Sequence, residues 1–407
     1  MTQTAMKSID MHCDTLMHAY FHHGEGADIY HMPEAMVDVR RLREGGALAQ
    51  FFAIFVPSRW EDRDWHGREP VSQEEYIRRC VRILERTIRA HGDIMAPALR
   101  AEDILSNRAR GKLSAVLTIE DGGVVREVWP CAVRIIDCYR AGTRHGIHRD
   151  ADGLLCAGEG LDQVTWMDVR IGTILPTPRH GKPVEINAYW YNALRIMARL
   201  APLAGADGAP YDALADQAGE SFRRAFWMPE AGRLRDVISP EPSAADTQLR
   251  CNQIWAVSMP FTPLTREQAA GVVRSVRSAL WTPCGLRTLD PADPDFHPVY
   301  GGPQKVRDMA YHQGTVWPFP LRGYYLAELR LGGFDEASCA RVRQDLEALT
   351  PALREGCLGH LPEIYDGGTP GASRGCFAQA WSVGELLRVC EALERPEAAG
   401  FEGGWAG

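Results

Sequence analysis

Three residues of the first third have the types and the spacing of metal ligands. His12 and Asp14 stand two apart at the end of an apolar stretch, so on a strand both side chains would point to the same face. Glu120 ends another apolar run, and the carboxyl ends of strands in a β/α barrel are where catalytic groups gather. An imidazole with two carboxylates suits one or two zinc ions. A strand end or a turn cap remains the simpler interpretation of a His-x-Asp pair alone.

A second group of polar and aromatic residues lies in three connections of the later sequence. Asp168 follows a tryptophan in the segment 165–168, and Glu363 lies in the turn-rich segment 359–367. The segment 311–318 adds polar donors and an aromatic side chain. Glycoside hydrolysis needs two carboxyl groups on opposite faces of a sugar, with aromatic surfaces and fixed polar groups around it. These carboxylates can meet only if the helices between them close into a ring.

Each of these positions also has a plainer structural interpretation. Asp168 could cap a helix, and Glu363 could pair with Arg374. His312 could satisfy the backbone of its own loop, and Trp381 lies at a spacing typical of helix packing. The glycosidase hypothesis therefore depends on the combination of positions and not on any one of them.

The elements that must position these residues differ between the two parts of the chain. In the first third, short apolar runs alternate with amphipathic helices, which implies parallel strands with right-handed crossovers. We therefore expect a partial β/α, barrel-like domain over residues 1–125. Its expected strands are 9–14, 47–56 and 113–120, and its expected helices are 38–46, 73–88 and 101–109.

The remainder, residues 126–407, predicts mainly helices. Pro130 suits a first helical position, a capping box at 265–268 opens another helix, and a hairpin turn is expected at 230–232. Eight or so helices with long connections favour a toroid of paired inner and outer helices. The other expected helices are 183–198, 211–226, 252–257, 269–280, 314–330, 336–354 and 377–393.

Composition excludes several functional classes. The 407 residues carry 45 Lys+Arg against 53 Asp+Glu, a net charge of −8, without a dense basic run, so no nucleic-acid partner is expected. No apolar stretch is long enough for a membrane span, and the start has no secretory signal. The 11 cysteines are scattered without a Cys-x-x-Cys pair, which is typical of reduced thiols. We expect a soluble cytoplasmic protein.

Four motifs occur in order in the first third, at 9–15, 41–46, 50–52 and 120–123. Together they resemble the membrane (renal-type) dipeptidase family of zinc enzymes over residues 8–125. The resemblance implies that His12, Asp14 and Glu120 are metal ligands, with zinc as the metal. In that family, histidines from later barrel strands complete a dinuclear site, and those strands do not follow here. We therefore do not expect a working peptidase.

Six motifs follow in the later sequence, at 150–155, 165–168, 181–188, 285–289, 311–318 and 379–383. They closely resemble the glucosidase module of the glycogen debranching (amylo-α-1,6-glucosidase) family from about residue 129 to 394. The resemblance implies a six-pair α/α toroid that removes single glucose residues from α-1,6 branch points with inversion. It also implies that Asp168 is the general acid and Glu363 the general base, without a metal or other cofactor.

The resemblance further assigns a sugar pocket. General acid catalysis requires a raised pKa at Asp168, and Glu363 must stay ionised. Inversion predicts a separation of roughly 6.5–9.5 Å between the two carboxyl groups. The residues implied for the pocket are Trp166, Arg179, Glu185, Asn187, His312, Gln313 and Trp317.

The sequence therefore predicts a mixed fold, in which a partial β/α (TIM-like) fragment precedes a mostly α, incomplete (α/α)6 toroid. The toroid is expected to be incomplete because six pairs need more helices than the sequence provides. The predicted function is a glycoside hydrolase acting on α-1,6-linked glucose of glycogen or a branched α-glucan. Two alternatives remain: a zinc-dependent, dipeptidase-like metal-binding protein, and an inactive fused or truncated product. The oligomeric state is left open.

Overall fold

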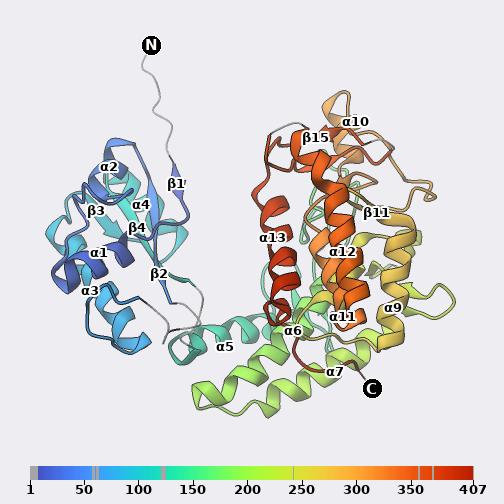
Figure 1. Cartoon of the computed structure of the whole chain (residues 1–407), viewed down its shortest axis with the longest axis horizontal. Coiled ribbons are helices and arrows are strands. Elements are labelled where there is room, and N and C mark those ends of the chain that lie inside the picture. Colours follow the sequence, from blue (N-terminus) through green and yellow to red (C-terminus); the bar gives the residue numbers. More distant parts are fainter. Residues whose placement is uncertain are drawn as a thin grey trace. The chain divides into compact units, whose positions relative to one another are not determined.

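The computed structural model describes residues 8–56, 60, 64–120, 125–241, 243–355, 358–368 and 371–406. The chain forms two compact units, Met1–Pro130 and Cys131–Gly407, which are described separately (Figure 1). Residues 121–124, which belong partly to the motif 120–123 and adjoin the expected boundary at 125, lie outside the described residues.

The first unit contains a four-stranded parallel sheet in the order β1-β2-β4-β3. The three expected strands are present, and the short strand β3 is an addition that pairs with β4. Because β3 precedes β4 in the chain but lies outside it in the sheet, the strands do not follow the sequential order of a barrel. The strands are β1 (Ile9–Asp10), β2 (Ala49–Phe55), β3 (Met95–Pro97) and β4 (Leu113–Glu120).

Two helices of the first unit, α2 and α3, begin at a side-chain cap. The Asp38 carboxylate accepts the amide of Arg41 at 2.8 Å, and the Ser72 hydroxyl accepts that of Glu75 at 3.2 Å. Their apolar faces and the strands bury one core, with Phe52 fully buried in it. The helices are α1 (Thr15–His23), α2 (Val39–Glu44), α3 (Gln73–Ala90) and α4 (Ala101–Ala109).

Helix α5 (Val125–Ala141) leads into the second unit and corrects one expectation. Pro130 lies inside this helix and not at its first position. The helix already begins at Val125, before the proline, and the sequence alone did not reveal this first turn. Pro130 therefore removes one backbone hydrogen bond from the interior of the helix. Within the described residues, no helix is both long and apolar enough to cross a lipid bilayer.

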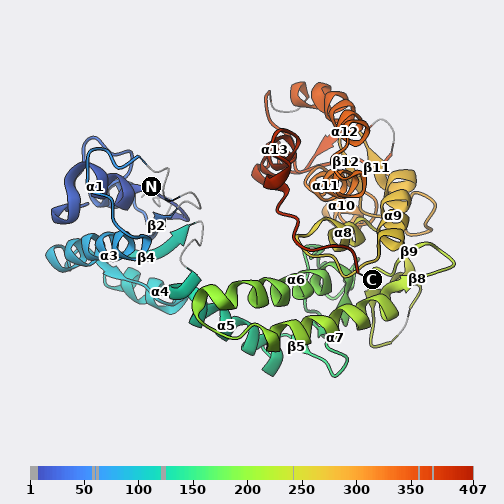
Figure 2. The same ribbon diagram turned by 60° about the horizontal axis from the view of Figure 1, so that its bottom comes forward.

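The second unit is mainly helical. Helices α6 and α7 lie side by side (Figure 2), and α11 packs against both α12 and α13. The predicted capping box is present, because Thr265 and Gln268 each accept the other's backbone amide. The helices are α6 (Val184–Leu200), α7 (Ala209–Phe226), α8 (Trp255–Ser258), α9 (Arg266–Ser275), α10 (Gln304–Ala310), α11 (Leu321–Gly332), α12 (Glu336–Leu349) and α13 (Ala380–Glu394).

The helix expected at 314–330 is shorter than predicted. Residues Val316–Trp317 form strand β13, and helix α11 begins only at Leu321. Pro318 and Pro320 explain the difference, because proline has no backbone amide for a helix interior. Trp317 therefore belongs to a sheet and not to a helix.

A five-stranded antiparallel sheet in the order β11-β12-β13-β14-β15 joins distant segments of the second unit. It pairs Val316 with Tyr365 and Ile364 with Arg374, and so brings the segments around Trp317 and Glu363 together. A Cβ atom at Gly285 would lie 2.4 Å from the carbonyl oxygen of Trp317, so this pairing requires glycine. The strands are β11 (Trp281–Thr282), β12 (Gly285–Arg287), β13, β14 (Ile364–Tyr365) and β15 (Ser373–Arg374).

Three two-stranded pairs complete the second unit. The hairpin expected at 230–232 is confirmed by antiparallel pairing of β8 with β9. The pairs are β5 (His148–Arg149) with β6 (Leu155–Cys156), β7 (Lys182–Pro183) with β10 (Val237–Ile238), and β8 (Trp227–Met228) with β9 (Arg233–Leu234).

Candidate active site

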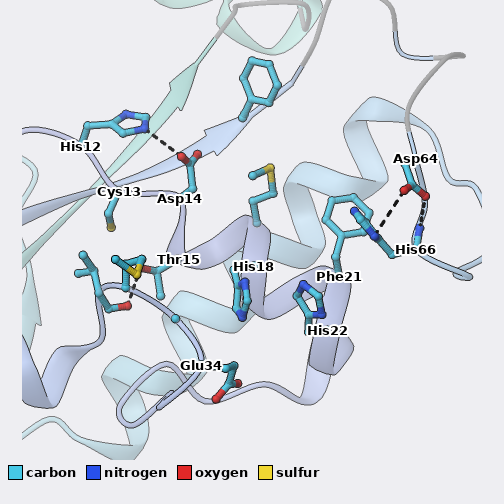
Figure 3. A pocket seen from close by; sticks show the side chains of 15 residues that line it. His12, Cys13, Asp14, Thr15, His18, Phe21, His22, Glu34, Asp64 and His66 are labelled. Atoms are coloured by element: carbon cyan, nitrogen blue, oxygen red, sulfur yellow. Dashed lines mark hydrogen bonds and ion pairs between the residues drawn. The ribbon is translucent and has the colours of Figure 1, made fainter.

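The first unit brings His12 and Asp14, which follow β1, close to Glu120 at the end of β4, with β2 between the two strands. Backbone hydrogen bonds between Cys13 and both Phe51 and Ala53, each 3.0 Å, continue the parallel pairing of β1 with β2. The Cys13 side chain is buried, so His12 and Asp14 on either side of it point outward. The ring of His12 lies beside the carboxylate of Asp14 (Figure 3).

These three side chains offer converging ligand atoms. His12 Nε2 lies 3.4 Å from Asp14 Oδ2 and 3.6 Å from Glu120 Oε2, and one ligand atom from each residue lies within 4.8 Å of the others. All three side chains are about half exposed. Asp14 precedes helix α1, but its side chain makes no capping hydrogen bond there. An imidazole and two carboxylates in this arrangement suit zinc.

In the second unit, Glu363 is held by two donors, one on each carboxylate oxygen. The hydroxyl of Tyr311 donates to Oε1, and the backbone amide of Cys376 donates to Oε2 at 2.8 Å. The backbone of Glu363 also donates to the Cys376 carbonyl at 2.8 Å, next to the pairing of β14 with β15. The carboxylate is half-buried, and Arg374, its alternative partner, pairs with Asp366 instead. Glu363 is thus oriented without a charged partner in the described structure.

Asp168 is fixed by its two preceding neighbours. The indole of Trp166 donates to Asn252 Oδ1 at 2.7 Å, and the amide of Asn252 lies 3.5 Å from the sulfur of the buried Met167. The Asp168 side chain itself is exposed. The protein around it still displaces part of the surrounding water, and this desolvation raises the pKa of the Asp168 carboxyl. Two anchored neighbours therefore present a carboxyl whose pKa is raised by desolvation.

Tyr311 connects the surroundings of the two carboxyl groups. Burial raises its pKa, and the hydrogen bond and negative charge of Glu363 raise it further. The charge of Asp168 acts on Tyr311 in the same direction. Tyr311 therefore remains a protonated donor to Glu363, and the charge of Asp168 adds to the rise of its pKa.

Aromatic rings surround this region. The ring of Trp166 meets those of His312, Trp317 and Phe319 edge-on, with centroids 5.0–5.3 Å apart. Trp381 stacks on Phe319 at 4.2 Å and is 38% exposed. Trp381 is therefore not a core residue, which was its simpler interpretation. A partly exposed aromatic ring in this cluster suits the apolar face of a sugar.

A buried network of charges lies behind these side chains. Arg179 pairs with both oxygens of Glu185 and with Asp236, whose Oδ2 lies 2.7 Å from the guanidinium Nε. Burial opposes the charge on Arg179, but the two carboxylates outweigh it and raise the guanidinium pKa. Asp236 also accepts the Asn252 amide at 2.8 Å. Through Asp236, the network holds Asn252, which in turn accepts the hydrogen bond from the indole of Trp166.

Several residues predicted for the sugar pocket are buried and already bonded to protein atoms. Asn187 bonds the backbone of Leu155 at 2.7 and 3.1 Å, and Gln313 bonds Arg250 and the Pro176 carbonyl. These residues, like Arg179 and Glu185, are therefore buried and have partners within the protein. Of the predicted pocket, Trp166 is the member that is only partly buried.

His312 is buried among aromatic rings, and within the described residues neither ring nitrogen has a hydrogen-bond partner. Burial and the charges of Arg250 and Arg179 lower the pKa of His312 to about 3, so its ring is neutral. Its backbone carbonyl accepts Arg250 at 2.8 Å. The expectation that the His312 side chain hydrogen-bonds to the backbone of its own loop is wrong, because neither ring nitrogen makes such a bond within the described residues.

Sequence reasoning missed the residues that orient the carboxyl groups. Tyr311 is the first residue of the motif 311–318, but nothing in that motif predicts its hydrogen bond to Glu363. Asn252, Asp236 and Arg250 reach their partners only through the tertiary fold. The polar residues Arg250, Asn252 and Gln253, which precede the apolar residues from Ile254, gave no sign of their partners in the sequence.

Comparison with known proteins agrees with this division of the chain. A family model described as amylo-alpha-1,6-glucosidase matches residues 114–388, and one described as membrane dipeptidase matches residues 1–129. These matches and the carboxylate site define a protein of the glycosidase class. The chain belongs to the amylo-alpha-1,6-glucosidase family, and its first third carries the dipeptidase match.

One curated relative and two solved structures are similar to parts of the chain. The glycogen debranching enzyme of Saccharomyces cerevisiae is 29% identical over 224 residues, which cover 44% of this chain but only 14% of that enzyme. A GH63 mannosylglycerate hydrolase from Thermus thermophilus shares 24% identity at a TM-score of 0.37, covering 51% of this chain and 47% of that one. A GH78 rhamnosidase of Bacillus sp. GL1 shares 18% identity at a TM-score of 0.42, covering 67% and 24% respectively.

Proposed function

We propose that the second unit hydrolyses α-1,6-linked glucose at the branch points of glycogen or a related α-glucan. The observation that carries this proposal is the pair of donors that orients Glu363, the Tyr311 hydroxyl on one carboxylate oxygen and the Cys376 amide on the other. The exposed ring of Trp381 nearby offers a surface for a sugar. Family membership supplies the substrate class.

In the proposed reaction, Asp168 protonates the glycosidic oxygen as the bond from the anomeric carbon to that oxygen breaks. Its raised pKa favours the proton that this step consumes. Glu363 takes a proton from the water that attacks the anomeric carbon from the opposite face. Tyr311 and the Cys376 amide hold the Glu363 carboxylate in place for that water. The net reaction is hydrolysis with inversion and needs no cofactor.

We further infer that the helices of the second unit form part of an (α/α)6 toroid. The pairs α6–α7 and α11–α12 are of the kind that such a ring repeats. The described residues of the second unit form fewer helices than six pairs would need. Misplacement of a catalytic group by about 1 Å can cost on the order of 100-fold in rate, so a slow enzyme is consistent with this proposal.

Glucose release from a branched limit dextrin tests the function. The Asp168→Asn and Glu363→Gln variants should each lose this release. Glu328→Gln is a matched control, because Glu328 also accepts a tyrosine hydroxyl, that of Tyr324 at 2.7 Å. Release that continues in the two site variants would contradict the assignment. Release that is absent from the unmodified chain would favour an inactive fused or truncated product.

The converging ligand atoms of His12, Asp14 and Glu120 favour a second candidate function, binding of zinc by the first unit. Bound zinc would supply a Lewis acid and activate water. His12 would provide the imidazole ligand, and Asp14 and Glu120 the carboxylates. Metal analysis should find more zinc in the purified chain than in the His12→Ala variant. Equal zinc in both proteins would rule out this site, whatever the outcome of the glucosidase assay.

A further inference from the structure

A cavity of about 660 Å³ in the first unit contains three histidines that no metal or catalytic assignment yet includes. His18 and His22 stand one turn apart on helix α1, with ring centroids 4.3 Å apart. The ring of His66, from a following loop, has its centroid 5.8 Å from that of His22. Figure 3 shows the first two rings side by side, with His66 and Asp64 farther along the helix. Three imidazoles therefore share one open cavity.

The loop that carries His66 is fastened to the same helix. Arg68 Nε donates to the backbone carbonyl of Phe21 at 2.8 Å. The ring of Phe21 also meets those of Trp65 and His66, with centroids 6.1 and 5.3 Å apart. The backbone of His66 is held in the left-handed region (φ 48°), and its amide donates to Asp64 Oδ1 at 2.8 Å. These contacts fix the position from which His66 faces helix α1.

The ring spacing agrees with a shared metal ion. A zinc–nitrogen bond of about 2.0 Å places the ion about 3 Å from the ring centre, so two imidazoles at a tetrahedral angle have centres about 5 Å apart. The His18–His22 and His22–His66 separations of 4.3 and 5.8 Å lie on either side of that value. As the described side chains stand, the nitrogens of the three histidines do not all lie within 4.8 Å of one another, so metal binding requires side-chain rotation. His22 and His66 are exposed, so rotation about their side-chain bonds can turn their nitrogens toward the ion.

Two further contacts point to an absent ligand. Nε2 of His18 is shielded from solvent and has no hydrogen-bond partner among the described residues. Nδ1 of His66 lies 3.5 Å from Asp64 Oδ2, and histidines that bind metals commonly direct their second nitrogen to a carboxylate. Histidines spaced i, i+4 on one helix face are also a known zinc-binding arrangement.

We propose that His18, His22 and His66 form a zinc site, separate from the cluster of His12, Asp14 and Glu120. The separate donor set is all imidazole, a ligand type that suits zinc and neighbouring transition metals. Glu34 also lines the cavity, where it can balance the charge of the ion. This proposal is independent of the glucosidase function, since all its residues belong to the first unit.

Zinc titration by calorimetry tests the proposal in the full-length chain. The background is the Asp14→Asn/Glu120→Gln double variant, which removes two ligands of the other cluster. This background should still bind one equivalent of zinc. Cobalt bound in its place should show the visible absorption of a tetrahedral site. Adding His22→Ala to this background should weaken zinc binding at least about 100-fold. Removing a residue that only hydrogen-bonds to a metal ligand already weakens metal binding about 10- to 100-fold, and removing the ligand itself should weaken it more.

Two further variants make the result decisive. His66→Ala should produce the same loss from a different segment of the chain, with an unchanged circular dichroism spectrum. His91→Ala is the control, because this histidine stacks on Tyr30 and bonds Asp28 and does not line the cavity. It should bind zinc as the background does. The proposal is wrong if the background binds no zinc, or if zinc binding survives both His22→Ala and His66→Ala.

Discussion

Replacing Tyr311 with phenylalanine removes one hydroxyl group from the second unit. The Tyr311 hydroxyl donates to Glu363 Oε1, while the Cys376 amide still holds Oε2. The ring contacts with His312 and Trp317, at centroid distances of 4.7 and 5.2 Å, remain possible for phenylalanine. The substitution therefore loosens the proposed general base while the aromatic packing stays in place.

The expected loss follows from the type of bond removed. A hydrogen bond to a charged group contributes about 1.5–3 kcal/mol, and each 1.36 kcal/mol on the barrier changes a rate about tenfold. We therefore expect kcat to fall roughly 10- to 100-fold with KM nearly unchanged. Activity should not vanish, because the second donor to Glu363 remains.

The assay is glucose release from limit dextrin at several substrate concentrations. Tyr324→Phe is the matched control, since it deletes the same kind of bond, from Tyr324 to Glu328, in helix α11. This control should lower thermal stability without a comparable fall in kcat. An equal fall in both variants would show that Tyr311 acts only on folding. An unchanged kcat in Tyr311→Phe would refute its positioning role.

Three further predictions follow from the site. Because burial raises the pKa of Asp168, and only the protonated acid donates, kcat should fall as the pH rises through that raised pKa; a kcat that increases over this range would contradict the role. Arg179→Met leaves Glu185 and Asp236 poorly compensated, so chemical denaturation should show a loss of about 3–5 kcal/mol; a loss below about 1 kcal/mol would contradict it. Trp381→Ala should raise KM about 2- to 10-fold through a lost aromatic contact; an unchanged KM would exclude sugar binding there.

The sequence predicts the parts of the fold that have clear periodicity. Strands β2 and β4 and helices α4, α6 and α7 agree with their predicted limits to within two residues. Short strands escape such analysis, because two residues have no period. The sheet containing β13 and β14 is made of such strands, so its pairing of Val316 with Tyr365 could not be foreseen.

The candidate sites differ in how far the sequence could define them. His12 and Asp14 stand two apart after β1, and Glu120 ends β4 in the same parallel sheet, so the expected strand pattern already indicated that these side chains could converge. Asp168 and Glu363 lie in irregular connections, where no repeating geometry relates one residue to the other. Their surroundings depend on partners such as Tyr311, which the tertiary fold supplies.

The configuration of the glucose released from a branched limit dextrin tests the central claim most directly. Proton NMR of the first turnovers separates the two anomers before they interconvert. Attack by water activated at Glu363, with Asp168 protonating the leaving oxygen, predicts β-glucose from the α-1,6 linkage. Initial release of α-glucose would contradict the assigned pair of carboxyl groups. No glucose release under any condition would contradict the proposed glucosidase function itself.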